Sequence, residues 1–436
     1  MSTLNVDKVD PSTGTDLELG TSGDTITVPT GAGLTVVDEV KTNKVSPATG
    51  TDFALGDSGD TFTVPSGATI VNSGTATGFG ASLRPNVNPL IINGDMAVAQ
   101  RGTSFAAEGE QYTLDRWYYE KNNDGVVTIT QEALTADEAY EDGFSTAIKV
   151  DVTTADTSFT TNQRAYIEYT IEGQDLQLVK KGTANAEKLT LAFWVKATKT
   201  GTNVVRMDAF DTSRACSQAY TVSSTDTWEK KVLNFPADTT GVIDNDNGQG
   251  LRVAWGMGAG TNYTSGTLAT TWEAYTDANT FVGQVNNFDS TSNNFHITGV
   301  QLEVGEYTSS TLPPFQHESF GDNFLRCCRY YQRSYEYGTA YASNTGNGAI
   351  NYVEGVDNGR FFIPFRNGSM RAAPNMTIQR KNGGGTDQGQ RNDFGSTYLD
   401  VDGISGKLNG VEFLQNGTQS GQGYTFVSQF LADAEL

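Results

Sequence analysis

The sequence contains few histidines and cysteines, and this shortage excludes several classes of site. Its 436 residues include only two histidines, His296 and His317, and three cysteines, Cys216, Cys327 and Cys328. Two histidines exclude a histidine-rich metal centre, and any Ser/His/Asp or Cys/His relay would have to use one of them. The cysteines form neither a paired disulfide framework nor a spaced set of metal ligands, so we expect buried thiols.

Positive charge and long apolar runs are also scarce. The chain has 29 lysines and arginines against 51 acidic residues, which gives a formal net charge of −22. Such a balance favours solubility and argues against nucleic acid or an anionic membrane as a partner. No apolar run approaches the ~18–20 residues of a membrane span. The first residues lack the basic and apolar regions of a signal peptide, so we expect no membrane insertion and folding in a cytoplasm.

The chain contains a sequence repeat of two copies near its beginning. TGTDLELGTSGDTITVPTGA at 13–32 returns as TGTDFALGDSGDTFTVPSGA at 49–68. In both copies apolar residues alternate with polar ones at period two, as in half-buried strands, and glycines and prolines separate the strands. The alternating apolar residues are Leu17, Leu19, Ile26 and Val28 in the first copy and Phe53, Leu55, Phe62 and Val64 in the second.

Each repeat is too small to fold alone. About half a dozen inward apolar residues cannot offset roughly 1–2 kcal/mol of ordering cost per residue, and stacked repeats need about three or more copies. We therefore expect residues 1–80 to form an intertwined β shaft of three identical chains, with these apolar residues at the trimer interface. A flexible Gly/Thr/Ser linker is the alternative, although linkers do not keep a strict apolar alternation.

The pattern of polar and apolar residues changes after a Gly/Pro/Asn stretch at 78–89. Short segments of alternating polarity, among them AYIEYTIE, KLTLAFWVKA and LRVAWGM, are separated by Gly, Asn, Asp and Thr clusters. Long helical patterns are nearly absent, so the pattern predicts an all-β sandwich or jelly roll over residues 81–316. The run GMGAG at 256–260 lacks the strand–turn–helix context of a phosphate-binding loop, and we interpret it as a turn.

One segment has the periodicity of a helix. In ESFGDNFLRCCRYY at 318–331, Phe320, Phe324, Cys328 and Tyr331 recur on one face, with acids early and arginines late. We expect Phe320, Phe324 and Cys328 to pack against the same face of sister chains at the trimer interface. The helix and a smaller C-terminal β domain form the third predicted region, residues 317–436.

Five segments form an ordered set of motifs. They are NPLIINGDMAVAQRG at 88–102, YTLDRW at 112–117, LTLAFWVKA at 189–197, TDTWEKKVLNF at 225–235 and HITGVQLEVGEYTSSTLPPFQHESFGDNFLRCCRYYQRS at 296–334. Together they resemble bacteriophage tail-fibre proteins that carry a carbohydrate-binding-module-like jelly roll. The sequence departs from that pattern at Met96, where an aromatic residue is usual, and at Gln316, where an acid often occurs.

The resemblance implies a function and a location. It implies a homotrimeric tail-fibre adhesin of the virion, assembled in the host cytoplasm, that presents β domains to a bacterial surface glycan. The N-terminal region would attach it to other tail or head proteins. A structural virion protein without a receptor role, such as a neck, head-fibre or capsid decoration protein, is the alternative. A glycan depolymerase is a third reading, but two repeats do not make the long β-helix usual in depolymerases, so we expect no enzyme.

Sugar binding needs exposed aromatic rings that stack on a pyranose and polar side chains that bond its hydroxyls. The candidate ligand-binding residues are Trp255, Trp272 and Tyr275, with Asn262 and Asp277 nearby in the sequence. The tryptophans within the strand motifs are expected in the core, namely Trp117, Trp194 and Trp228. Trp272 and Tyr275 lie outside those motifs, and for them a core position and a surface position are both open.

Acidic residues suggest two further sites. Similar jelly rolls hold a structural calcium. The resemblance makes Asp95, in the opening motif, and Glu303, in the closing motif, candidate ligands of that calcium. The alternative is that each of these acids is solvated or hydrogen-bonded within the protein. No other cofactor is expected. Glu168 and Glu172 are of the residue type of a glycosidase pair, which needs carboxylates about 5–10 Å apart across a cleft. Because acids are abundant in this chain, a solvated surface is the favoured interpretation of the pair.

Overall fold

The computed structural model describes residues 89–340, 343–353, 360–380, 386, 388–391, 398–416 and 425–436. The chain divides into two compact units, Met1–Ala76 and Thr77–Leu436, and the described residues belong to the second. The predicted shaft lies outside the described residues, so its threefold assembly stays a prediction. The same holds for its interface residues Leu17, Leu19, Ile26, Val28, Phe53, Leu55, Phe62 and Val64.

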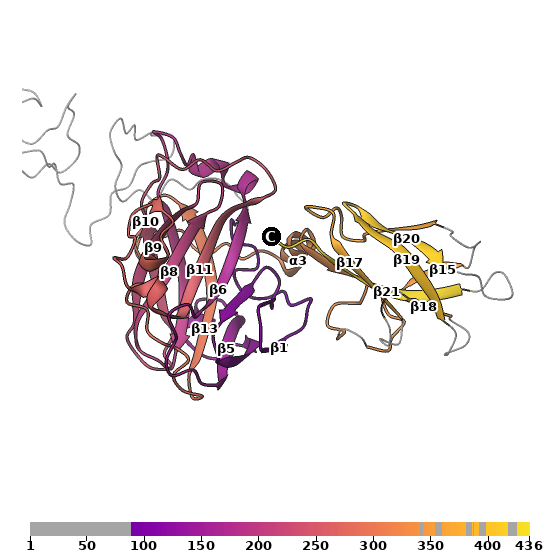
Figure 1. The fold of residues 1–436 in the computed structure, drawn as a ribbon, viewed down its shortest axis with the longest axis horizontal. Coiled ribbons are helices and arrows are strands. Elements are labelled where there is room, and N and C mark those ends of the chain that lie inside the picture. Colours follow the sequence, from indigo (N-terminus) through magenta and orange to yellow (C-terminus); the bar gives the residue numbers. More distant parts are fainter. Residues whose placement is uncertain are drawn as a thin grey trace, which may run out of the picture. The chain divides into compact units, whose positions relative to one another are not determined.

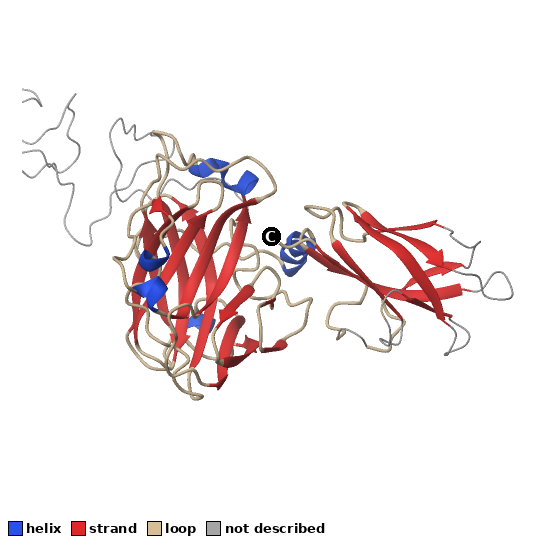
Figure 2. Cartoon of the chain, in the orientation of Figure 1, coloured by secondary structure: helices blue, strands red, loops and turns tan. Residues whose placement is uncertain are grey.

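Two antiparallel sheets form a jelly-roll β-sandwich (Figures 1 and 2). Its strands are β1 Ser104–Ala107, β2 Gln111–Tyr112, β3 Tyr118–Asn122, β4 Val126–Ala133, β5 Thr146–Thr154, β6 Arg164–Glu172, β7 Leu189–Ala197, β8 Gly201–Ala209, β9 Arg214–Val222, β10 Glu229–Phe235, β11 Gln249–Ala259, β12 Glu273–Ala274 and β13 Asn294–Val304. One sheet has six strands in the order β1-β4-β5-β13-β7-β10. The other has seven, in the order β12-β9-β8-β11-β6-β3-β2.

The apolar residues that alternate along these strands meet between the two sheets. Trp117, Tyr169, Phe193 and Trp255 are each at most 1% exposed and lie at the centre of this core. The ring centroids of Trp117 and Trp255 are 5.5 Å apart, and those of Phe193 and Trp255 are 5.8 Å apart. The expected burial of Trp117 is therefore confirmed. Trp228 is also buried, in a smaller cluster against which the partly buried Trp194 packs.

A third sheet follows the sandwich along the chain. Its strands are β14 Tyr331–Arg333, β15 Ile350–Val353, β16 Arg360–Pro364, β17 Asn375–Arg380, β18 Gln388–Arg391, β19 Tyr398–Lys407, β20 Gly410–Asn416 and β21 Thr425–Asp433. Strand β21 is its hub, because β14, β15, β17 and β18 all pair with it. The sheet has a core of its own, in which Tyr352, Phe413 and Phe426 pack together. The predicted domain limits at 81 and 316 remain predictions.

Helices are few and short in the described part of the chain. They are α1 Glu138–Glu141, η1 Gly173–Val179, α2 Thr261–Thr264, η2 Asp277–Asn279 and α3 Phe320–Cys328. Among these residues no helix is both long enough and apolar enough to cross a membrane. The predicted mostly β composition is confirmed for the described residues. The helix predicted within 318–331 is α3, which begins where the Ser319 hydroxyl accepts a hydrogen bond from the Asp322 N–H.

The inward face of α3 packs on its own chain. Cys327 and Cys328 are both fully buried, and Phe324 packs against the sandwich core. The predicted contact of Cys328 with a sister chain is therefore wrong, because its thiol is enclosed by this chain and accepts a hydrogen bond from Asn367 at 3.4 Å. Phe320 is 48% exposed, and its place in a trimer interface stays a prediction. The expected buried thiols are confirmed, and burial raises the pKa of Cys328 to about 12.

Candidate functional site

The face of the seven-stranded sheet that points away from the core carries charged and aromatic side chains. Tyr118 of β3, Glu168 of β6, Arg206 and Asp208 of β8 and Arg252 of β11 all point to this face, because the residues on either side of each belong to the core. Register brings them together: Tyr118 is opposite Glu168, and Arg252 is opposite Asp208. We call these five residues, together with Tyr275, the Arg252 patch.

Ion pairs connect the floor of the patch. Arg252 donates from Nη1 to Glu168 Oε2 at 3.1 Å and from Nε to Asp208 Oδ2 at 2.9 Å. Arg206 donates from Nε to the same Asp208 oxygen at 2.9 Å. Two guanidinium groups thus face two carboxylates, and the side chains are held rigidly by three neighbouring strands.

One donor of this network has no partner. Arg206 is 1% exposed, and its Nη1 makes no hydrogen bond to any residue that the structure describes. A buried donor left unsatisfied costs about 1–3 kcal/mol. The Arg206 guanidinium lies 4.8 Å from the Phe281 ring centroid and 5.1 Å from that of Tyr166, so these rings cover it and a ligand oxygen would reach Nη1 only if they moved aside.

Phenolic rings stand at opposite edges of the patch. Tyr275 directly follows β12, is 37% exposed, and has its ring centroid 5.6 Å from the Arg206 guanidinium. Tyr118 lies on the far side, where its ring meets that of Tyr112 edge-on at 4.8 Å. Burial is the main cause that raises the pKa of Tyr275 to about 12, so its hydroxyl stays protonated at neutral pH. From β3 to β8 the patch is roughly 14 Å wide, which is three interstrand spacings.

The segment between β11 and β13 covers the neighbouring part of this face. Phe281 stacks on Tyr166 with ring centroids 5.8 Å apart, and Tyr263 belongs to the same small cluster. Gly256 makes room for this packing, since a Cβ there would lie 2.9 Å from the Phe281 ring. The interpretation of GMGAG as a turn is therefore wrong, because Gly256 to Ala259 belong to strand β11 and the missing side chains admit an aromatic cover.

The sequence-predicted ligand residues do not form one site. Trp255 is fully buried in the core, so a stacking role for it is wrong: its indole already fills the space between Trp117 and Phe193. Asn262, on α2, donates a hydrogen bond to Asn162 Oδ1 and does not belong to the patch. Tyr275 and Asp277 do lie together, and a hydrogen bond to Asp277 is among the causes that raise the pKa of Tyr275.

Trp272 has a structural role. Its Nε1 donates to the Pro236 carbonyl at 2.8 Å, and the ring packs against the core. The Lys181 ammonium lies 4.2 Å from the ring centroid and covers it. A surface role for Trp272 is therefore corrected, because both its ring and its N–H are already occupied within the chain.

The acidic pair is not a solvated surface pair. Glu168 is 9% exposed and belongs to the patch, while Glu172 is fully buried. Glu172 accepts hydrogen bonds from Arg329 Nε at 2.9 Å and Nη2 at 2.8 Å. The expectation of solvation is wrong for both residues, because each is paired with an arginine. Glu172 is bound to Arg329 and cannot act opposite Glu168.

Each candidate calcium ligand has a hydrogen-bond partner within the chain. The Asp95 carboxylate accepts from Asn323 Nδ2 at 3.1 Å, and the Glu303 carboxylate accepts from Gln301 Nε2 at 3.4 Å. Within the described ranges no group of three or more His, Cys, Asp or Glu side chains is placed to hold a metal ion. Two acids with separate protein partners do not provide the six to eight oxygen ligands that calcium takes.

The titration of Glu168 gives the first test. Burial raises the pKa of Glu168 to about 6 from an ordinary value of 4.5. Between these values the folded chain binds more protons than the unfolded chain, so this carboxyl lowers the free energy of unfolding as pH rises through the window, by about 2 kcal/mol. The free energy of unfolding, measured with urea at pH 4.5 and at pH 6.5, should therefore change less between the two pH values in Glu168→Gln than in wild type. The exposed Glu306→Gln should keep the wild-type slope, and an unchanged slope in Glu168→Gln would contradict the assigned pKa.

Comparisons with known proteins give only distant likenesses. No protein-family model and no curated protein matches the chain. The enzymatically active domain of tailspike protein 4 from bacteriophage CBA120 is similar at 14% identity and a TM-score of 0.27, over 50% of this chain and 21% of that one. A family 11 carbohydrate-binding module from Clostridium thermocellum, in complex with a β-1,3-1,4-mixed-linked tetrasaccharide, is similar at 9% identity and a TM-score of 0.25, over 47% of this chain and 98% of that one.

A third likeness is the xylan-binding domain of Xyn10C from Paenibacillus barcinonensis. It is similar at 13% identity and a TM-score of 0.24, over 49% of this chain and 96% of that one. The matched part spans about a fifth of the tailspike chain but nearly the whole of the two binding modules. At these TM-scores neither the ligands nor the activities of those proteins carry over to this chain.

Proposed function

We propose that this chain is a glycan-binding protein without enzymatic activity, and that the Arg252 patch contacts the sugar. The observation that carries the proposal is the buried Arg206 Nη1, a donor without a partner on the β8 side of a charged floor edged by tyrosine rings. A rigid sheet holds these groups in place, so little ordering cost is added when a ligand binds. In this proposal Tyr275 stacks on a sugar ring, Arg206 and Arg252 donate to its oxygens, and Glu168 accepts from a hydroxyl.

We propose further that the chain works as a homotrimeric tail-fibre adhesin of a virion. The motifs between 88 and 334 support this context through their resemblance to tail-fibre proteins. Three patches on one particle would engage a repeating surface glycan together, and such multivalency raises the overall affinity by about 10² to 10⁴. A weak single site is therefore sufficient for firm attachment.

Binding to an array of purified bacterial surface glycans tests the proposal. The intact chain should bind at least one glycan saturably, and Tyr275→Ala should weaken that binding at least tenfold, because the stacking ring is lost. Its melting temperature should stay near the wild-type value, since a partly exposed ring contributes little to folding. Tyr140→Ala is the matched control: Tyr140 is a 46% exposed tyrosine on α1, outside the patch, and its variant should bind normally.

Two outcomes would contradict the proposal. If Tyr275→Ala binds as tightly as wild type, the ligand does not use the patch. If the intact chain binds no surface glycan at all, the alternative of a structural virion protein without a receptor role takes its place.

A further inference from the structure

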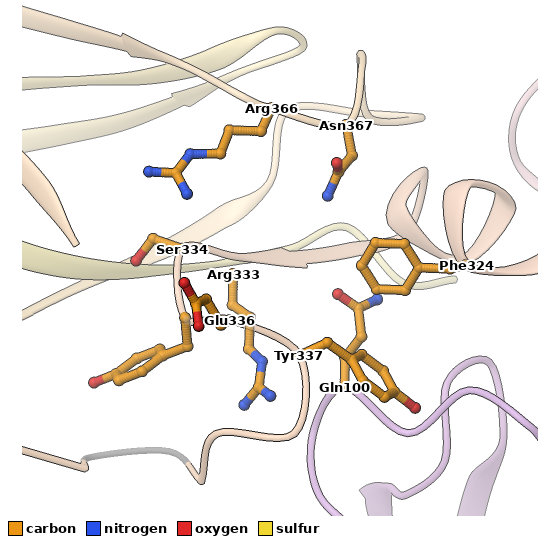
Figure 3. Close-up of a pocket in the computed structure, with 9 residues that line it drawn as sticks. Gln100, Phe324, Arg333, Ser334, Glu336, Tyr337, Arg366 and Asn367 are labelled. Carbon is orange, nitrogen blue, oxygen red and sulfur yellow. The ribbon is translucent and has the colours of Figure 1, made fainter. Parts of the chain in front are cut away.

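An open pocket of about 240 Å³ lies outside the Arg252 patch and shares no residue with it. Phe324 of α3 lines one wall, and Arg333 and Tyr337, from the end of β14 and the loop after it, line another. Arg366 and Asn367, which follow β16, complete the lining used here. Figure 3 shows the rings of Phe324 and Tyr337 at one end of the pocket, away from Arg366.

The pocket carries more positive than negative charge. Arg333 and Arg366 line it, and Glu336 is the one acid among its lining residues. Neither guanidinium forms an ion pair with a residue in the described ranges, and Arg366 donates a single hydrogen bond, to the Gly348 carbonyl at 3.3 Å. Arg333 is partly buried, and this burial lowers its pKa even though the Asp115 carboxylate and the neighbouring tyrosines act in the opposite direction. A half-buried cation without a counter-ion is stabilised by an anion that enters from solvent.

Aromatic rings and an amide lie beside Arg333, and such groups can contact the ring and the hydroxyls of a polar ligand. Tyr337 is anchored by a hydrogen bond from the Ala99 N–H at 2.9 Å, and its ring meets that of Phe324 edge-on at 5.6 Å. Gln100 also lines the pocket, and its Nε2 donates to Asp115 Oδ1 at 2.6 Å and to the Tyr331 carbonyl at 2.9 Å. Gln100 Oε1 accepts a hydrogen bond from the Cys328 thiol at 4.0 Å, and its second lone pair remains as an acceptor.

We propose that this pocket binds a carboxylate-bearing sugar unit. A planar guanidinium matches a carboxylate with two parallel hydrogen bonds, so Arg333 takes the carboxylate and Arg366 adds positive potential. The sugar ring lies against Phe324 and Tyr337, and one of its hydroxyls donates to Gln100 Oε1. The proposal goes beyond the proposed function because the site is separate from the patch and requires an acidic ligand.

Isothermal titration of the intact chain with D-glucuronate tests the proposal. Wild type should bind D-glucuronate at low salt, and Arg333→Gln should weaken binding at least tenfold. Arg333→Lys, which keeps the charge but loses the planar fork, should fall between them. Arg360→Gln is the matched control, because Arg360 is an exposed arginine of the same sheet paired with Glu412, and its variant should bind as wild type does. The melting temperature of each variant verifies that it is folded.

Two further ligands show which part of glucuronate the pocket recognises. Glucose has the ring without the carboxylate, and benzoate has the carboxylate on an aromatic ring. Both should bind at least tenfold more weakly than glucuronate. Equal binding of glucose, tighter binding of benzoate, or wild-type affinity in Arg333→Gln would each overturn the proposal.

The patch variant distinguishes this proposal from the proposed function. Tyr275→Ala should leave glucuronate binding unchanged. If it abolishes glucuronate binding while Arg333→Gln does not, the sugar binds in the patch and the pocket proposal fails alone. If glucuronate requires Arg333 but no glycan requires Tyr275, the pocket proposal stands and the proposed function of the patch fails.

Discussion

Replacing Glu435 with alanine should lower the free energy of unfolding by about 3–5 kcal/mol and the melting temperature by roughly 10 °C. The Glu435 carboxylate pairs with Arg116 and, at 3.3 Å, with Arg101. The side chains of Arg116 and Glu435 are 1% and 3% exposed. Without Glu435 the Arg116 guanidinium is left buried among the rings of Tyr169 and Tyr330, with no carboxylate from the described residues beside it.

Asp433→Ala is the matched control for this prediction. Asp433 pairs with the same Arg101 at 2.9 Å, but its side chain is 41% exposed. Exposed ion pairs contribute about 0–1 kcal/mol, so this variant should melt within a few degrees of wild type. Calorimetry of the two variants would contradict the account if both lowered the melting temperature equally.

Replacing Asp238 with alanine should destabilise the sandwich by a similar amount, about 3–5 kcal/mol. The Asp238 carboxylate pairs with Lys181 and with Arg214 Nε at 2.8 Å, and the side chains of Asp238 and Lys181 are each 2% exposed. Burial alone would raise the pKa of Asp238, but hydrogen bonds from Arg214 and Lys181 lower it to about 2. Asp238→Ala leaves the Lys181 ammonium buried over the Trp272 ring without the carboxylate that neutralises it.

A double variant and a pH series test the same pair. Removing the cation as well, in Asp238→Ala/Lys181→Met, should recover part of the lost stability, because an apolar side chain then replaces an unpaired charge. Since the folded pKa of Asp238 is depressed, its contribution should be present above about pH 3.8 and lost as pH falls toward 2. A double variant less stable than Asp238→Ala, or a single variant with the wild-type acid transition, would contradict the role of the pair. Glu306→Ala, at an exposed pair with Lys188, is the control.

The pattern of the sequence was sufficient for the elements but not for their arrangement. Alternating polarity predicted the strands, and the spacing of Phe320, Phe324 and Cys328 predicted α3. Alternation does not state which strands pair: β13 lies between β5 and β7, and its His296 is opposite both Lys149 and Lys196. It also does not state what covers a helix, so the inward face of α3 was assigned to sister chains although its own chain encloses it.

The candidate site was harder to predict than the fold, because four distant strands build it. Tyr118, Glu168, Arg206 and Arg252 meet only through strand register, which one sequence does not show. A signal was present: Arg206 and Arg252 each lie between two apolar residues of a strand, and a charge there must face outward or find a partner. Trp255 was assigned to the ligand site although its strand gave a contrary signal: it lies two residues after Val253 and three after Arg252, so alternation places it on the face opposite Arg252.

The position of a bound oligosaccharide would show whether the Arg252 patch holds the sugar. A crystal structure of the intact chain, soaked with an oligosaccharide of the surface glycan that it binds, would show which side chains touch the sugar. We expect a sugar ring on Tyr275, with an oxygen within hydrogen-bond distance of Arg206 Nη1 and another near Arg252. A sugar bound elsewhere on the sandwich, with the patch untouched, would contradict this expectation.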